Sequence, residues 1–255
     1  MCILFLAINQ HSKYPLLICA NRDEFYKRPT MGAHFWSENP SMLAGKDLQA
    51  GGSWLGVNRQ GFFAAITNIR SAGKPSSDKR SRGELVTMAL QSDSVISMSW
   101  LEKNGELYNP FNLVYGSLDK LVCYNSVTKK HIHLADGFHA ISNGELDDIW
   151  PKMAKGEKQL EAIVNLGQTI EPEQLFSILK DQRKAEDGML PKTGVSLEWE
   201  RLLSSIFINS PDYGTRSSCL LLLESDGSIK FIERQYGVKG NKGEQLSFSN
   251  WLNSG

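Results

Sequence analysis

The sequence has no excess of charge of either sign. Its 28 lysine and arginine residues balance 28 aspartate and glutamate residues, so the formal net charge is zero. Such a chain offers no broad basic surface to nucleic acid or to an anionic membrane. We therefore expect no nucleic-acid partner, and we favour a small molecule as the partner.

Long apolar runs are also missing. A run such as 219–223 falls far short of the roughly 20 residues that a membrane-spanning helix needs. The apolar start of the chain lacks a basic flank and leads directly into a second predicted strand, so we expect no signal peptide. These features predict a protein without an integral membrane segment.

Cysteine is scarce and its spacing is wide. The four cysteines are Cys2, Cys19, Cys123 and Cys219, and no CxxC pair exists. Zinc sites normally use paired cysteines, so we expect no metal. Three of the four lie in strand-like runs, where a free thiol behaves as a small hydrophobic residue. A reducing, cytoplasmic location fits this usage.

Apolar alternation at both ends of the chain and helical spacing in its middle predict an α+β fold. Hairpins are expected where short turns separate apolar runs, at Asn58–Gly61 and Ser225–Gly227. The polar cluster Asn21–Glu24 is typical of a solvated turn, and 25–36 reads as irregular. The expected strands are 2–9, 16–21, 51–57, 61–68, 111–115, 120–125, 131–134, 215–224 and 228–234; the expected helices are 83–91, 92–104 and several within 149–203. Strands, helices and strands in this order predict sheets packed between helical layers, in a single domain spanning 1–255.

Residue chemistry places a candidate site around Cys2. Removal of Met1 would leave Cys2 with a thiol, pKa about 8.5, and a free α-amine, pKa about 7.7–8.0, so one residue could supply nucleophile and base. Asp23 can orient the amine, Asn68 and Asn143 can donate to an oxyanion, and Arg216 can anchor a carboxylate. Each also has a plain structural interpretation: a core cysteine, strand-end turn residues, or a turn cap.

A family resemblance adds to this interpretation. The segment Asn21-Arg22-Asp23-Glu24, some twenty residues after an initial Met-Cys, resembles the signature of the NRDE family, also called transport and Golgi organisation protein 2. The resemblance covers nearly the whole chain. It implies an N-terminal-nucleophile hydrolase fold, a four-layer αββα sandwich of two antiparallel sheets. Its further segments are 52–56, 65–68, 82–86, 108–113, 142–143, 150–152 and 213–216.

A more distant resemblance is to choloylglycine hydrolases and penicillin V acylases. It implies Cys2 as nucleophile, Asp23 as carboxylate, Asn68 and Asn143 as the two asparagines, and Arg216 as the later arginine. Those enzymes carry an arginine three residues before the aspartate, where this chain has Ala20. Arg22 stands next to Asp23 instead, and its side chain would point to the opposite face of a continuing strand.

The NRDE resemblance also implies intracellular haem trafficking, with haem as a cargo and no required cofactor. Haem is often held by an axial His, Cys or Tyr. His131 and His133 share one face of a predicted strand, where an exposed polar edge explains them better than haem ligation does. Two hypotheses follow. The first, favoured by Ala20, is a haem-trafficking protein built on a hydrolase scaffold; the alternative is a cysteine hydrolase of linear, non-peptide amides.

Overall fold

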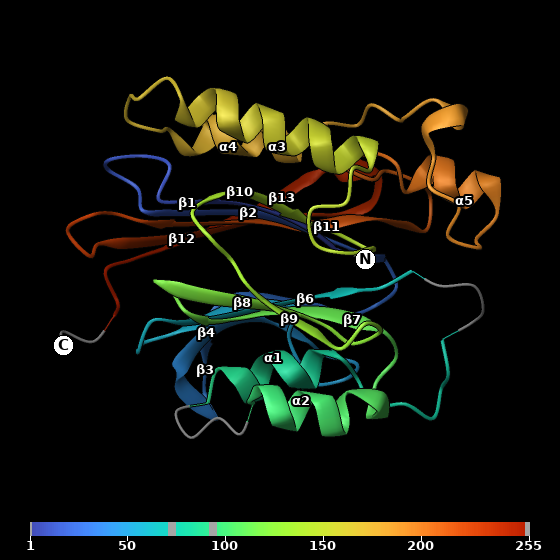
Figure 1. Cartoon of the computed structure of the whole chain (residues 1–255), viewed down its shortest axis with the longest axis horizontal. Coiled ribbons are helices and arrows are strands. Elements are labelled where there is room, and N and C mark those ends of the chain that lie inside the picture. The colour runs from blue at the N-terminus through green and yellow to red at the C-terminus, as the bar shows by residue number, and fades with distance from the viewer. Residues whose placement is uncertain (1, 71–74, 92–95, 253–255) are drawn as a thin grey trace. The chain divides into compact units, whose positions relative to one another are not determined.

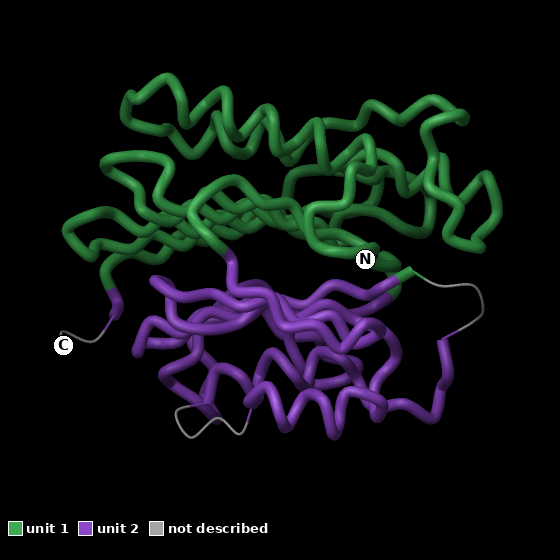
Figure 2. The backbone as a smooth tube through the Cα atoms, in the orientation of Figure 1, with its two compact units in different colours: residues 1–27, 70–73, 135–250 green, residues 28–69, 74–134, 251–255 purple. Residues whose placement is uncertain are grey.

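The computed structural model describes residues 2–70, 75–91 and 96–252. The chain divides into two compact units built from interleaved segments (Figure 2). Unit 1 comprises 1–27, 70–73 and 135–250, and unit 2 comprises 28–69, 74–134 and 251–255. The single domain spanning 1–255 stays a prediction.

Unit 1 contains a six-stranded antiparallel sheet in the order β10-β1-β2-β11-β12-β13. Helices α3 and α4 cover one face of it (Figure 1). The bounds are β1 (Cys2–Ile8), β2 (Leu16–Phe25), β10 (Gly137–Ile141), β11 (Tyr213–Leu223), β12 (Ile229–Tyr236), β13 (Lys242–Ser249), α3 (Pro151–Val164), α4 (Pro172–Leu179), α5 (Leu197–Leu202) and the 3₁₀ turns η2 (Asp187–Met189) and η3 (Val238–Gly240).

Alternation along β1 explains how α3 docks. Ile3, Phe5 and Ala7 share one face of the strand and join the core that α3 and α4 complete. Gly156 of α3 lies against the Phe5 ring, where a Cβ atom would come within 3 Å of the ring carbons. This close approach brings the start of α3 to the sheet that carries Cys2.

Unit 2 contains a seven-stranded antiparallel sheet in simple sequence order, β3 to β9. Helices α1 and α2 pack on it around buried residues that include Leu85, Leu101 and Tyr124. The bounds are β3 (Thr30–Trp36), β4 (Asn39–Asp47), β5 (Leu55–Asn58), β6 (Phe62–Asn68), β7 (Phe111–Ser117), β8 (Lys120–Asn125), β9 (Lys130–His133), α1 (Gly83–Ala89), η1 (Gly105–Leu107) and α2 (Met98–Asn104).

The predicted α+β class and both hairpins are confirmed: β5 pairs with β6, and β11 pairs with β12. The predicted helix 92–104 begins only at Met98, and 92–95 lie outside the described residues.

Two local interpretations were wrong. The irregular stretch 25–36 contains strand β3, and the solvated turn at Asn21–Glu24 is a continuation of strand β2. Among the described residues, no helix has the length and apolar character needed to cross a membrane.

Candidate active site

Cys2 begins β1 and lies directly opposite Arg22 of β2. Residues paired in this way project to the same face of a sheet, so the thiol and the guanidinium are neighbours. The Ser142 hydroxyl donates to the Cys2 carbonyl oxygen at 3.1 Å, which holds the strand end in place. Burial raises the pKa of the Cys2 thiol and the charge of Asp23 raises it further, while Arg22 lowers it. The thiol therefore needs a base before it can act as a nucleophile.

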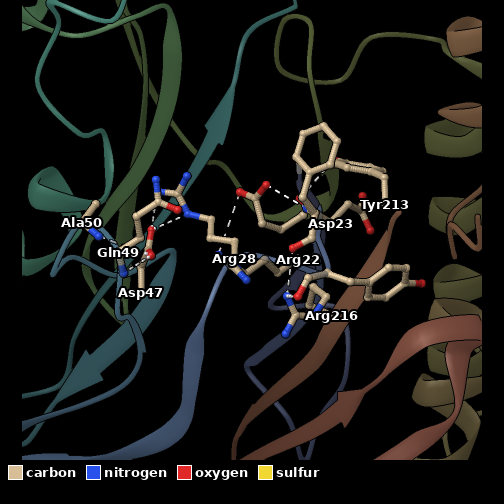
Figure 3. A network of polar contacts seen from close by, with 11 residues as sticks. Arg22, Asp23, Arg28, Asp47, Gln49, Ala50, Tyr213 and Arg216 are labelled. Atoms are coloured by element: carbon tan, nitrogen blue, oxygen red, sulfur yellow. Dashed lines mark hydrogen bonds and ion pairs between the residues drawn. The ribbon is translucent and has the colours of Figure 1, made fainter. Parts of the chain in front are cut away.

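Asp23 projects to the opposite face and is almost fully buried. The Thr215 hydroxyl donates to Asp23 Oδ1 at 2.7 Å. The Tyr213 hydroxyl donates to the Asp23 carbonyl oxygen at 3.1 Å (Figure 3). Burial raises the pKa of the Asp23 carboxyl, against the opposing effects of Lys152, Thr215 and Arg22. The hydrogen bond from Thr215 of β11 thus fixes the direction of the carboxyl, and the positive charges of Lys152 and Arg22 favour its ionised form.

Asn143 follows β10 and is completely buried. Its backbone carbonyl accepts from the Arg70 N–H at 2.7 Å. Its side-chain oxygen accepts from the Ser142 hydroxyl at 3.2 Å and from Arg70 Nη2 at 3.4 Å. Arg70 is held in turn by Glu200, at 2.5 Å between Nη1 and Oε2. These contacts orient the Asn143 amide beside the strand that begins with Cys2.

Arg216 lies at a bulge in β11, between the pairs Thr215–Asp23 and Ser217–Arg22. A bulge redirects a side chain out of the regular alternation. Arg216 Nη1 donates to the carbonyl oxygens of Phe25 at 3.0 Å and Tyr26 at 3.3 Å, next to the end of β2 (Figure 3). Burial and the like charge of Arg22 lower the pKa of Arg216.

Four of the five predicted catalytic residues therefore lie in unit 1: Cys2, Asp23, Asn143 and Arg216. Asn68 ends β6 in unit 2, two residues before Arg70. Its convergence with the other four stays a prediction.

The four motif residues alternate in direction because they lie in a strand. Asn21 is fully buried and bonds helix-side carbonyls: its Nδ2 donates to Leu179 O at 2.8 Å and Ile206 O at 2.9 Å. Glu24 is partly exposed; its Oε1 accepts from the Phe25 N–H at 2.8 Å, and its Oε2 lies 3.9 Å from Arg22 Nη2. The predicted turn was wrong because strands on both sides satisfy the backbone of this segment.

Several residues around the site were not singled out from the sequence. Tyr213 and Thr215 stand in the segment Tyr-Gly-Thr-Arg, and Lys152 stands in Trp-Pro-Lys, so family motifs contained the signal for these three. Glu200 lies in an ordinary charged helix and carries no sequence signal. In the parts of the chain that the structure describes, no group of three or more His, Cys, Asp or Glu side chains could hold a metal ion.

His131 departs from its predicted exposed position on β9. Its side chain is only 3% exposed, and its ring lies 4.5 Å, between centroids, from that of Tyr124. Burial lowers the pKa of His131. The strand is an edge strand, but α2 residue Glu102 reaches to 3.8 Å from His131 Nε2 and helps to cover the ring.

Comparison with known proteins completes the description of the site. The family described as Transport and Golgi organisation 2 matches residues 1–237. The chain belongs to this family. The human Transport and Golgi organization protein 2 homolog is 34% identical over 259 residues, covering 92% of each chain. The Bos taurus homolog is 33% identical over 257 residues, also covering 92% of each. The resemblance seen in the motifs is thereby confirmed.

Among solved structures, a mutant of the conjugated bile acid hydrolase from Clostridium perfringens has a TM-score of 0.52. The match covers 100% of this chain and 98% of the hydrolase, at 11% sequence identity. An identity this low establishes the fold alone, which is that of N-terminal-nucleophile hydrolases. The predicted fold class is confirmed.

Proposed function

We propose that this family member is a cysteine amidohydrolase that cleaves a non-peptide carbon–nitrogen bond of an acylated amine. The observation that carries the proposal is the grouping of Cys2, Asp23 and Asn143 at one end of the sheet in unit 1. A nucleophile, a fixed buried carboxyl and an oriented amide are the parts that amide hydrolysis requires.

The reaction would start from a chain that begins at Cys2. The free α-amine takes the thiol proton, and the sulfur attacks the amide carbonyl. Asn143, joined by Asn68, donates to the oxyanion. The carbon–nitrogen bond then breaks as the amine leaves with the proton, and a water molecule hydrolyses the thioester to release the acid. Asp23 stabilises the ammonium form of the Cys2 amine, and no cofactor takes part.

Arg22 supports this proposal over the interpretation drawn from Ala20. Both residues lie in β2, two positions apart, so their side chains share the face that carries Cys2. Ala20 pairs with Leu4, whereas Arg22 pairs with Cys2 itself. The positive charge that position 20 lacks is therefore supplied two pairs closer to the nucleophile.

The test uses protein that begins at Cys2 and a panel of N-acylated amines. We expect Cys2→Ala to abolish turnover and Cys2→Ser to leave a trace, because a hydroxyl is far less acidic than a thiol. Asn143→Ala should lower kcat by roughly 10²–10³, the usual loss for one oxyanion donor. The rate should rise with pH as the α-amine loses its proton and then level off.

Cys123→Ala is the matched control, since this buried thiol belongs to unit 2; it should leave turnover unchanged. Turnover that persists in Cys2→Ala would exclude the mechanism.

The second candidate function is haem transport, with haem as cargo. A pocket of about 260 Å³ in unit 2 supports it, because Tyr115, a residue type that can ligate haem iron, lines it. The apolar side chains of Phe62, Ala89 and Ile96 share the lining with the polar side chains of Asn58, Gln60 and Gln91.

Titration with haem tests this candidate. A carrier should show a saturable Soret shift that survives Cys2→Ala and weakens in Tyr115→Phe. Tyr14→Phe, in the core of unit 1, should bind as the wild type does. A titration without saturation, or one that Tyr115→Phe leaves unchanged, argues against haem in this pocket.

A further inference from the structure

Lys152 is a buried lysine at the start of α3. Trp150 precedes the helix with an extended backbone, Pro151 opens it, and Lys152 follows with only 4% of its surface exposed. A buried charge is costly and is kept where it has a use.

Four charged or ionisable groups from four different segments act electrostatically on Lys152. They are Cys2 in β1, Asp23 in β2, Arg70 after β6 and Glu200 in α5. Arg70 and Glu200 are matched to each other by their ion pair. The groups left for Lys152 to balance are the carboxyl of Asp23 and the thiol of Cys2.

Burial and the like charge of Arg70 lower the pKa of Lys152 to about 8, while Asp23, Cys2 and Glu200 oppose the shift. A cavity of about 10 Å³ adjoins the side chain between Arg70, Trp150 and Glu200.

We propose that Lys152 is a positioning residue of the Cys2 site, whose buried ammonium group holds Asp23 as a carboxylate and favours the thiolate form of Cys2. The proposal rests on the proposed role of Cys2 as the nucleophile. It gives the site a second amine, in addition to the α-amine of Cys2, that responds to pH near neutrality.

The sign of the effect follows from the charge. Below about pH 8 the ammonium group is present and stabilises the thiolate. Above it, Lys152 loses its proton and the stabilisation disappears. The reactivity of Cys2 should therefore rise with pH less steeply above about pH 8 than that of a thiol with a constant environment.

The experiment measures the rate of Cys2 alkylation by iodoacetamide in the full chain, from about pH 6 to about pH 10. Peptide mapping by mass spectrometry follows Cys2 separately from Cys19, Cys123 and Cys219, which are all buried. We expect Lys152→Met to raise the midpoint of the profile by about one pH unit and to slow alkylation at neutral pH several-fold. The alkylation rate of this variant should follow a single titration curve with pH.

Lys152→Arg separates charge from packing. Arginine keeps its proton over this range, so the midpoint should stay low and the flattening above about pH 8 should vanish. Lys158→Met, at an exposed position of the same helix, is the matched control and should reproduce the wild-type profile.

A Lys152→Met profile equal to that of the wild type, in protein with an unchanged melting curve, overturns the proposal. If Lys152→Met does not fold, Lys152→Arg decides: loss of the flattening supports the proposal, and its retention overturns it. Alkylation needs no substrate, so a chain without amidase activity could still pass this test. A failed Lys152 test would likewise leave the hydrolysis experiment standing.

Discussion

Single residues of the segment Asn21–Glu24 have different tasks because they alternate across a strand. Arg22 faces Cys2, and Asp23 faces Thr215 on the other side of the sheet. Asn21 shares the Asp23 face but reaches only backbone carbonyls and the Ser218 hydroxyl, which donates to its Oδ1 at 2.6 Å. One motif thus combines site residues with a residue that ties the sheet to neighbouring segments.

Asn21→Ala should destabilise the protein without touching the reacting atoms. It leaves the buried Leu179 and Ile206 carbonyls and the Ser218 hydroxyl without these partners. We expect the free energy of unfolding to fall by about 3 kcal/mol, since each unsatisfied buried group costs about 1–3 kcal/mol. Urea denaturation measures it, with exposed Asn165→Ala as the control. Equal stability of the two variants would contradict this role.

Among the elements, β10 determines where Asn143 lies. It is an edge strand beside β1, and the turn after it folds back onto it. Asp147 accepts from the Ala140 N–H at 2.8 Å and contacts His139 Nδ1 at 2.9 Å. His139 Nε2 also lies 2.9 Å from the Ala135 carbonyl oxygen. The turn that contains Asn143 is thereby closed by a histidine–aspartate contact.

This contact predicts a pH-dependent stability. The hydrogen bond to Asp147 raises the pKa of His139. The folded-state pKa lies above the unfolded value of about 6.5, so the stabilisation is complete below about pH 6.5 and is lost as pH rises through the folded pKa. The wild type should exceed His139→Gln in unfolding free energy most at acidic pH, and the difference should shrink as pH rises.

Urea denaturation at a series of pH values measures this difference. Asp147→Asn should remove the same pH-dependent part of the unfolding free energy, because it removes the carboxylate that pairs with His139. A difference between wild type and His139→Gln that stays constant with pH would show that the histidine contributes through packing alone.

At the scale of the whole molecule, the proposed reaction draws on both units. Cys2, Asp23 and Asn143 belong to unit 1, whereas Asn68 belongs to unit 2. The chain passes from unit 2 to unit 1 just after Asn68, and Arg70 then bonds Asn143.

Asn68→Ala tests whether this asparagine shares the oxyanion with Asn143. We expect kcat to fall by roughly 10²–10³ in either single variant. The double variant should lose less than the product of the two, since residues that act as a unit are not additive. Asn39→Ala, at the start of β4 in unit 2, is the control for general effects. Unchanged turnover in Asn68→Ala would leave it as a strand-end residue.

The sequence by itself determined the α+β class, the family and the identity of the candidate site residues. Local patterns suffice for these: two-residue periodicity predicts the strands that form hairpins, such as β5–β6 and β11–β12, and short motifs identify the family. Only the tertiary structure decided the conformation of Asn21–Glu24. Asn and Asp favour turns locally, but pairing with β1 and β11, distant in sequence, satisfies the backbone and buries these side chains.

The same distinction applies to Arg22 and Lys152. No local pattern places Arg22 opposite Cys2, because strand register depends on pairing between separate segments. The sequence marks Lys152 only as part of the motif Trp-Pro-Lys, and only the packing of α3 on the sheet buries it within electrostatic reach of Asp23 and Cys2. The sequence specifies which side chains are charged or reactive, whereas the burial and the neighbours of these side chains depend on contacts between distant parts of the chain.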